Sequence, residues 1–273
     1  MKTLAFQGAF GAYAELAGLS YFNKKIKTVA VSGFEEVFNA VLKGKTDFGI
    51  IPIENSLAGS IHQNYDLLLK HPVWICGEIK LRVKHNLIVN KGAELKDIRR
   101  VYSHPQGLAQ CRNFIKNHLK KAEEFAFGDT AGAVRHIKEK RYLDGAAIAS
   151  SNAAERYGMK ILKSGIEDDE QNYTRFVILS RKPIKPSVKA KTSIVFALKN
   201  VPGALWKSLS VFAIQDLDLH KIESRPIPGS PWQYIFYLDV SGNVFDPAIK
   251  KAVDHLGEIT TYLKVLGSYP YGK

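Results

Sequence analysis

Residues 171–176 bring together side chains that can bind or protonate an anion: an amide, a hydroxyl, a guanidinium and an aromatic ring. The apolar run 177–179 follows directly and predicts a buried strand, so these side chains are expected at the mouth of a strand rather than on a free loop. The same pattern also fits an ordinary loop-to-strand transition with Arg175 in solvent. The elements that come before this stretch must decide between the two interpretations.

Polar side chains recur at the ends of the predicted strands in the first two thirds of the chain. Short apolar runs, such as residues 48–53 and 146–149, end in polar residues and lead into segments with a helical spacing of apolar side chains. In open α/β sheets, ligands bind beyond the carboxyl ends of the strands, where helix N-termini favour anions. The side chains expected to face such a crevice are Gln7, Asn55, Ser56, Ser103, Gln106, Thr130 and Ser151.

These strand-end residues favour a small polar ligand and no cofactor. The glycine–lysine loop that cradles a triphosphate is missing. Gly8 and Gly11 open a turn before a helix, but the third glycine and the acidic residue of a dinucleotide fingerprint do not follow. No His, Cys or carboxylate grouping has the spacing of metal ligands, so we expect no metal. Cys76 and Cys111 are interpreted as buried free thiols.

The charge of the chain allows two kinds of partner. The formal net charge is +13 and the pI is about 9.5, which suits nucleic acid but would equally attract a small dianionic metabolite. The lysine clusters come without an RNA-reading motif or a basic recognition helix, so we expect no nucleic-acid partner. No apolar run reaches the roughly 20 residues that cross a bilayer. We therefore expect a cytoplasmic protein with no membrane partner.

Two domains are expected in the 273 residues, separated by a linker rich in proline and lysine at residues 182–191. Residues 1–181 predict an α/β catalytic domain of two lobes around a central cleft, similar to a periplasmic binding protein. Its lobe one would hold residues 1–80 and 174–181, and its lobe two residues 81–173. The order of elements in residues 192–273 predicts a ferredoxin-like βαββαβ fold.

The motifs along nearly the whole chain resemble those of the prephenate dehydratases. The matching segments are residues 51–56, 103–106, 108–111, 147–150 and 174–176, of which the last is the hallmark of the family. The C-terminal module is similar to an ACT regulatory domain, in which residues 200–205 and 223–226 match the two segments that bind phenylalanine. The first loop departs from the family, because Ala9 and Ala14 stand where proline and serine are frequent.

The resemblance implies an enzyme that removes water and carbon dioxide from prephenate to give phenylpyruvate, the precursor of phenylalanine. It implies that Thr174 is the catalytic hydroxyl, which polarises the leaving group or relays a proton to it. A cation on the ring carboxylate would stabilise the ground state, so Arg175 is expected to anchor the other carboxylate or to be structural. The residues expected to bind the substrate are Asn55, Ser56, Ser103, Gln106, Asn172 and Arg175.

The resemblance also implies regulation. L-phenylalanine is expected as a feedback inhibitor bound where modules of two subunits meet, in a homodimer or homotetramer. The residues expected to bind this effector are Asn200, Pro202, Gly203, Ala204, Leu205, Glu223, Ser224 and Arg225. His104 is expected to cap its helix, and Glu54 to fix a loop.

Two alternatives remain open. An arogenate dehydratase performs the same chemistry on the aminated substrate and shares these motifs, although the lack of a transit-like segment favours prephenate. A solute-binding protein also has a two-lobed cleft, but it would carry a secretion signal and no regulatory module. Assays with both substrates separate the first alternative from the main prediction.

Overall fold

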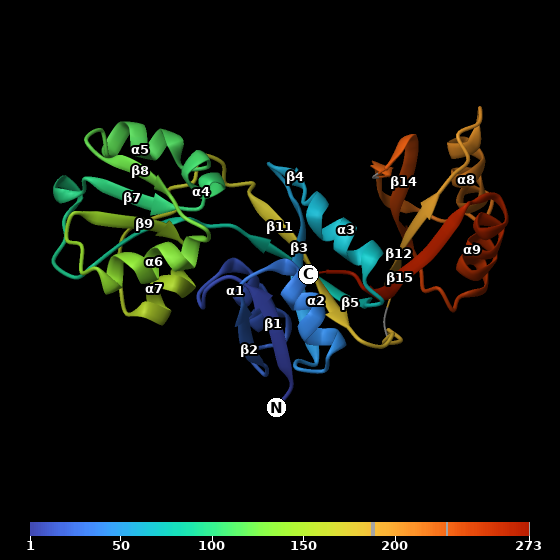
Figure 1. Ribbon diagram of the computed structural model, residues 1–273, viewed down its shortest axis with the longest axis horizontal. Helices are drawn as coiled ribbons and strands as arrows, with labels where there is room; N and C mark the ends of the chain where they lie inside the picture. Colours follow the sequence, from blue (N-terminus) through green and yellow to red (C-terminus); the bar gives the residue numbers. More distant parts are fainter. Residues whose placement is uncertain (187–188, 228, 273) are drawn as a thin grey trace. The chain divides into compact units, whose positions relative to one another are not determined.

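The computed structural model describes residues 1–186, 189–227 and 229–272 (Figure 1). Residues 187 and 188 of the predicted linker, and residues 228 and 273 of the predicted C-terminal domain, lie outside the described residues. The chain forms two compact units, one made of residues 1–64 and 79–176, the other of Tyr65–Glu78 and the chain from Val177 onward. Helix α3 (His62–Lys70) and strands β5 (Trp74–Arg82) and β11 (Tyr173–Ser180) run through both.

Lobe one is built on a sheet with the strand order β2-β1-β3-β11-β5, in which β4 also pairs with β3. Strand β1 runs parallel to both β2 and β3. Helix α1 packs closely on β1 because Gly18 has no side chain: a Cβ there would lie 2.2 Å from Leu4 Cδ2. The elements of this lobe that have not been given above are β1 (Thr3–Gln7), α1 (Tyr13–Tyr21), β2 (Lys27–Val31), α2 (Phe34–Leu42), β3 (Phe48–Asn55) and β4 (Gly59–Ser60).

Lobe two has a sheet of strand order β10-β6-β9-β7-β8, with helices on both of its faces (Figure 1). Strand β7 runs parallel to β8 and β9, whereas β6 runs antiparallel to β9 and β10. The elements are β6 (Asn86–Val89), η1 (Leu95–Asp97), β7 (Arg100–Ser103), α4 (Pro105–Ala109), α5 (Arg112–His118), β8 (Glu123–Ala126), α6 (Thr130–Glu139), β9 (Gly145–Ala149), α7 (Ser151–Tyr157) and β10 (Lys160–Ser164).

Hydrogen bonds link the two lobes at several places. The connecting segments run side by side, since the Val83 N–H donates to the Asn172 carbonyl at 2.8 Å. The loop between β1 and α1 also reaches lobe two, where Ser150 Oγ donates to the Gly11 carbonyl at 2.7 Å. Gly11 has a φ of +96°, and a Cβ on it would lie 2.6 Å from the Ala153 Cα. Only glycine therefore allows this loop to approach helix α7 so closely.

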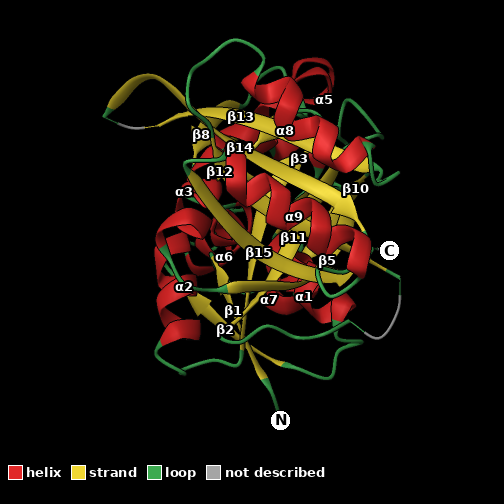
Figure 2. Ribbon diagram, turned by 90° about the vertical axis from the view of Figure 1, so that its right-hand side faces the viewer, coloured by secondary structure: helices red, strands yellow, loops and turns green. Residues whose placement is uncertain are grey.

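The C-terminal module has the predicted βαββαβ order, which is thereby confirmed. Its four strands pair in the order β13-β14-β12-β15, and every neighbouring pair is antiparallel. Figure 2 shows α8 and α9 on one face of this sheet, where a buried cluster including Phe196, Phe212 and Leu238 joins them to it. The elements are β12 (Ala190–Ala197), α8 (Ala204–Ala213), β13 (Leu219–Ile227), β14 (Ser230–Ser241), α9 (Pro247–Ile259) and β15 (Tyr262–Pro270).

The other face of this sheet is covered by the segment Tyr65–Glu78, which holds the end of α3 and the start of β5. The rings of Tyr65 and Tyr237 lie 4.7 Å apart, and Tyr237 Oη donates to the Tyr65 carbonyl at 3.0 Å. Lys264 Nζ donates to the carbonyl of Leu68 at 2.8 Å and so caps the last turn of α3. In the described part of the chain, no helix is both long and apolar enough to span a bilayer.

Candidate active site

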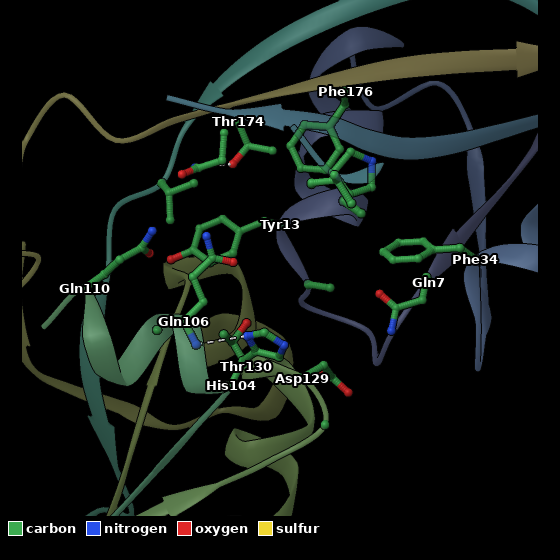
Figure 3. Close-up of a pocket in the computed structure, with 18 of the residues that line it drawn as sticks. Gln7, Tyr13, Phe34, His104, Gln106, Gln110, Asp129, Thr130, Thr174 and Phe176 are labelled. Atoms are coloured by element: carbon green, nitrogen blue, oxygen red, sulfur yellow. Dashed lines mark hydrogen bonds between the residues drawn. The ribbon is translucent and has the colours of Figure 1, made fainter. Parts of the chain in front are cut away.

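A cavity of about 470 Å³ lies in the first unit and is lined from both lobes (Figure 3). Lobe one contributes residues from β1, α1, α2, β3, α3 and β11, and lobe two contributes residues from the segment before β6, from α4 and its ends, and from the start of α6. The polar side chains among these are Gln7, Tyr13, Asn55, Gln63, His85, His104, Gln106, Gln110, Asp129, Thr130 and Thr174. Of the side chains expected to face the crevice, Gln7, Asn55, Gln106 and Thr130 line this cavity, whereas Ser56, Ser103 and Ser151 do not.

The direction of one hydrogen bond defines what Thr174 can do. Asn55 Oδ1 accepts the backbone N–H groups of Leu57 at 3.1 Å and Ala58 at 2.9 Å, so the amide nitrogen must be the atom that faces Thr174. Asn55 Nδ2 lies 3.0 Å from Thr174 Oγ1 and donates to it. The hydroxyl oxygen of Thr174 is therefore an acceptor in this bond, and its own hydrogen is left to donate to a molecule in the cavity.

Asn172 and Ser56 support this pair from outside the cavity. Asn172 is fully buried and its Oδ1 accepts from Asn55 Nδ2 at 2.8 Å, but it is not among the lining residues. Ser56 Oγ donates to the Gln171 carbonyl at 2.6 Å and accepts the Tyr173 N–H at 2.9 Å. Both side chains thereby fix the strand end that carries Thr174.

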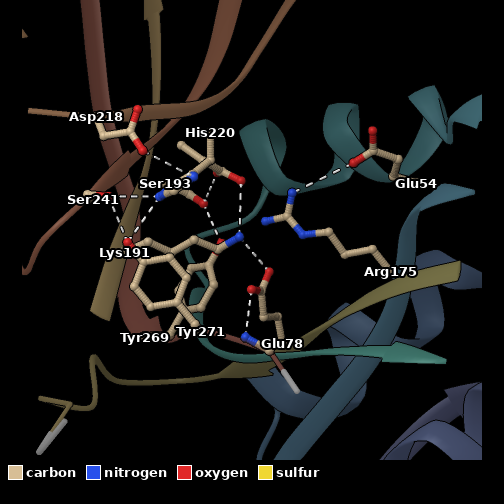
Figure 4. Close-up of polar contacts among 12 residues, drawn as sticks. Glu54, Glu78, Arg175, Lys191, Ser193, Asp218, His220, Ser241, Tyr269 and Tyr271 are labelled. Carbon is tan, nitrogen blue, oxygen red and sulfur yellow. Dashed lines mark hydrogen bonds and ion pairs between the residues drawn. The ribbon is translucent and has the colours of Figure 1, made fainter. Parts of the chain in front are cut away.

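Two more of the expected substrate-binding residues point away from the cavity. Ser103 is fully buried and donates to the Ile148 carbonyl at 2.7 Å, which ties β7 to β9. Arg175 is 9% exposed, and its Nη1 lies 3.7 Å from Glu54 Oε2 (Figure 4). This geometry favours the structural role of Arg175 over the anchoring role, and it matches the expectation that Glu54 fixes a loop.

A chain of hydrogen bonds crosses the cavity wall through His85, which the motifs did not single out. His85 Nδ1 lies 3.0 Å from Tyr13 Oη, and its Nε2 lies 3.0 Å from Gln110 Oε1. Burial lowers the pKa of His85, although the bond to Gln110 and the nearby Glu167 carboxylate oppose this shift. A neutral His85 has one N–H, and Gln110 Oε1 can only accept it. The Gln110 amide nitrogen is then turned toward the cavity.

The sequence pattern indicates only weakly that Tyr13 and Gln110 line the cavity. Tyr13 is the first residue of α1, and its Oη lies 2.8 Å from the Lys84 carbonyl oxygen as well as 3.0 Å from His85 Nδ1. Burial raises the pKa of the Tyr13 phenol well above its usual value, so the phenol stays protonated. Gln110 lies in the matched segment 108–111, but His85 and Asp129 lie outside every matched motif. Only the fold brings them to the cavity.

Two helices of lobe two present capped N-termini at the cavity. His104 Nδ1 accepts the Gln106 N–H at 3.2 Å and caps α4, as expected from the sequence. Asp129 Oδ1 accepts the Gly132 N–H at 2.6 Å and caps α6. Of the lining residues in the described part of the chain, none is Lys or Arg. An anion in this cavity would therefore be held by neutral donors.

A second cavity, of about 230 Å³, lies in the C-terminal module. It is lined by four of the expected effector residues, Asn200, Gly203, Ala204 and Leu205, but not by Pro202. Gly203 caps α8 with a φ of +76°, a conformation that glycine adopts readily. The aromatic side chains of the lining are Trp206, Trp232, Tyr234 and Phe236.

The other effector segment is divided between the two faces of the sheet. Ser224 lies opposite Phe236 in the pairing of β13 with β14, so it shares the face that carries the cavity. Glu223 and Arg225 point to the opposite face, because successive strand residues alternate. There Arg225 Nη1 lies 2.8 Å from Asp66 Oδ1 on α3. These two side chains thus point toward α3 rather than toward the cavity.

The described residues contain no group of three or more His, Cys, Asp or Glu side chains that could hold a metal ion. Cys76 and Cys111 are buried free thiols, which confirms the interpretation of the sequence. Burial raises the pKa of the Cys111 thiol far above its usual range.

Comparison with known proteins places the chain in one family. The family model described as prephenate dehydratase matches residues 4–184. An arogenate dehydratase/prephenate dehydratase from Arabidopsis thaliana is 45% identical over 98% of this chain and 72% of its own length. The structure of a prephenate dehydratase from Arthrobacter aurescens, in complex with L-Phe, has a TM-score of 0.90 at 29% identity, over 98% of this chain and 90% of its own. The structure of a protein described as a quorum quenching acylase has a TM-score of 0.90 at 33% identity, covering 99% and 98% of the two chains.

Proposed function

The chain belongs to the prephenate dehydratase family, and from that premise we propose that it converts prephenate into phenylpyruvate, water and carbon dioxide. The observation that carries this proposal is the bond from Asn55 Nδ2 to Thr174 Oγ1, which leaves the threonine hydroxyl free to donate into the cavity. A dehydration needs a donor of this kind at the departing oxygen.

The reaction breaks two bonds of the substrate at opposite carbons of its ring. The bond to the ring carboxylate breaks and releases carbon dioxide, and its electron pair moves into the ring. The C–O bond at the opposite carbon then breaks, and the departing hydroxide gains a proton, which comes in the end from solvent, to become water. Aromatisation of the ring drives the step. The protein has to stabilise the charge that grows on the departing oxygen.

Thr174 and Asn55 supply this stabilisation as a relay of two donors. Thr174 donates a hydrogen bond to the departing oxygen. Asn55 donates a hydrogen bond to Thr174 and so stabilises the negative charge that Thr174 shares with that oxygen. Because both backbone bonds to Asn55 Oδ1 are already formed, the relay needs no reorganisation during the reaction.

The lack of Lys and Arg in the described lining suits the carboxylate that departs. A lysine or arginine on that carboxylate would stabilise the ground state more than the transition state, because the charge disperses as carbon dioxide leaves. Donors such as the Gln106 and Gln110 amides can hold a carboxylate without this penalty. The lining residues of the described chain include such amides and no Lys or Arg.

The test is to offer the purified protein prephenate and its amino analogue arogenate separately. Arogenate carries the same ring, hydroxyl and departing carboxylate, so the same two donors would serve both substrates. Formation of phenylpyruvate from prephenate, lost in a folded Thr174→Ala variant, supports the proposal. Normal turnover in that variant would refute the role of Thr174.

An acylase activity is less well supported by this geometry. Amide hydrolysis by a hydroxyl needs a base that takes its proton. The hydrogen-bond partner of Thr174 Oγ1 in the described part of the chain is the Asn55 amide, which is not a base. His85 is instead engaged by Tyr13 and Gln110.

For regulation, we propose a catalytic domain of residues 1–181, a linker of residues 182–191 and an ACT domain of residues 192–273 whose cavity takes L-phenylalanine. The four expected residues that line the cavity support this assignment, as does the complex with L-Phe that is described for the Arthrobacter aurescens protein. Saturating phenylalanine should lower the turnover of prephenate and raise the melting temperature. No change in either would refute the effector assignment.

We also propose that two modules pair around this cavity, in a homodimer or homotetramer. Trp206 and Trp232, which line it, are 72% and 78% exposed in the single chain. Exposed aromatic side chains of this size are typical of interfaces. Sedimentation with and without phenylalanine tests the assembly, and cell fractionation tests the proposed cytoplasmic location.

A further inference from the structure

Asp129 is unusual among the residues that line the catalytic cavity. It is the only Asp or Glu side chain in the lining formed by the described residues. Its Oδ1 accepts the Gly132 N–H, but its Oδ2 has no hydrogen-bond partner within the described chain. One carboxylate oxygen is therefore available to a molecule in the cavity.

The cap of α6 does not by itself require a carboxylate. Asparagine and serine cap helices about as well as aspartate. A negative charge in a cavity for a dianion is unfavourable, because like charges repel. The N-terminus of α6 stabilises part of this charge, and a positive group on a ligand would complement it further.

The position of Asp129 indicates which part of the substrate it meets. Figure 3 shows Thr174 at one end of the cavity and Asp129 with His104 at the other. If Thr174 lies at the departing hydroxyl, as the proposed function requires, the three-carbon side chain on the opposite ring carbon extends toward Asp129. Prephenate has a keto group in that side chain, and arogenate has an ammonium group in its place.

We propose that Asp129 is a specificity-determining residue that binds the ammonium group of arogenate through Oδ2. The protein then accepts the amino substrate as well as prephenate, and this inference rests on the proposed function of the cavity. His104 complements Asp129: its Nδ1 accepts the Gln106 N–H, so the Nε2 of a neutral ring is an N–H donor. An ammonium beside Asp129 and a carboxylate beside His104 match the amino-acid end of arogenate.

The substitution that isolates the charge is Asp129→Asn. Asparagine keeps the cap of α6 but loses the negative charge, so the melting temperature should stay within about 2 °C of the wild type, since the two residues cap about equally well. The kcat/KM for arogenate should fall about 10- to 100-fold, the range expected when a charged partner is lost. The kcat/KM for prephenate should stay the same or rise. The loss should lie in KM rather than in kcat.

Asp246→Asn is the matched control. Asp246 stands at the N-cap of α9 in the C-terminal module, and its substitution removes the same charge at the start of a helix outside the cavity. Both substrates should be turned over as by the wild type. A change in the ratio of the two substrates in this variant would show that the effect follows from net charge and would overturn the inference.

The outcomes separate the inference from the proposed function. If the wild type converts neither substrate, the proposed function fails. If the wild type converts prephenate but not arogenate, the inference about Asp129 is overturned while the proposed function stands. The same holds if Asp129→Asn lowers kcat/KM equally for both substrates. Titration of arogenate and prephenate into the folded Thr174→Ala variant, with and without Asp129→Asn, gives the same comparison as binding constants without turnover. A selective loss of arogenate binding supports the inference.

Discussion

At the scale of single residues, the catalytic proposal depends on whether Asn55 or Thr174 donates in the hydrogen bond between them. Asn55→Asp changes the Nδ2 donor into an oxygen and keeps the size of the side chain. The Thr174 hydroxyl would then donate to the new carboxylate and no longer to the substrate. We expect kcat to fall by about 100-fold or more, the effect of removing one donor to a developing anion. Steady-state kinetics on prephenate, with circular dichroism as a check of folding, measures it; near-normal turnover would contradict the assigned direction of the bond.

The hydroxyl of Thr174 itself is tested by a matched pair of substitutions. Thr174→Ser keeps the hydroxyl and should retain kcat within about tenfold, whereas Thr174→Val keeps the shape and should lose about 100- to 1,000-fold. The Val variant should remain folded, because Thr174 is 8% exposed and lies in a regular strand. Equal losses in the two variants would assign the effect to packing rather than to the hydroxyl.

The buried His85 predicts a pH dependence of stability. Its folded pKa is lowered by burial, so the unfolded chain binds more protons at this site as the pH falls below about 6.5. The His85 contribution to the free energy of unfolding is therefore complete above that pH and is lost as the pH falls through the lowered folded pKa. His85→Gln removes the titration. The difference in melting temperature between wild type and variant should change between pH 7 and pH 5; a constant difference would refute the assignment.

The sequence predicted part of the site at this scale. Thr174, Asn55 and Gln106 line the cavity, whereas Arg175, beside Thr174, does not. The reason is that β11 begins at Tyr173, so Thr174 and Phe176 share one face and Arg175 the other. The sequence pattern predicted a strand only from residue 176 and therefore did not define the face. Asp129 and His85 could not be predicted, because their roles arise from the pairing of distant elements.

At the scale of elements, helix α3 carries residues of both compact units. Its first turn contributes Gln63 to the lining of the catalytic cavity, and Asp66 one turn later pairs with Arg225 on the strand of the second effector segment. The helix is continuous between these residues. A shift of Arg225 on effector binding is therefore expected to disturb its ion pair with Asp66 on α3.

Asp66→Asn should weaken inhibition by phenylalanine and leave the uninhibited rate within about twofold. Asp66 is half exposed, and such ion pairs contribute about 0–1 kcal/mol, so the inhibition constant should rise by up to about fivefold. Inhibition curves measure this effect. Lys70→Met, at the far end of the same helix, serves as the comparison. An unchanged inhibition constant for Asp66→Asn would exclude this route of coupling.

The elements themselves were predicted more completely than the site. The apolar runs and helix starts gave most strands and helices of both lobes, and the order of elements gave the C-terminal fold. Strand β10 was not predicted, because Lys160–Ser164 alternates polar and apolar residues at an exposed edge and has no continuous apolar run. Its antiparallel pairing with β6 depends on tertiary contacts that no local pattern encodes.

At the scale of the whole molecule, a buried charged cluster joins β5 to the C-terminal sheet. Lys191 Nζ lies 2.7 Å from Glu78 Oε2 and 3.6 Å from Asp239 Oδ2, and all three side chains are at most 8% exposed (Figure 4). Removing the Lys191 ammonium leaves the buried carboxylates of Glu78 and Asp239 without this compensating positive charge. Lys191→Met should therefore lower the free energy of unfolding by about 3–5 kcal/mol.

Urea denaturation measures this loss, and Lys96→Met provides the control. Lys96 pairs with Glu94 at 2.8 Å on the surface, with 76% and 64% of the side chains exposed, so its loss should barely change the free energy of unfolding. A similar small loss for Lys191→Met would show that the buried cluster contributes little to stability.

The contact of Gly267 with β5 limits how such a protein can be recombined. A Cβ at Gly267 would lie 2.0 Å from the Ile75 carbonyl oxygen, so this strand crossing tolerates only glycine. A chimera joined at the linker would combine the segment Tyr65–Glu78 of one parent with the C-terminal sheet of another. Successful exchange, in the laboratory or during evolution, should therefore transfer that short segment together with the regulatory module, although more than a hundred residues separate them in the gene.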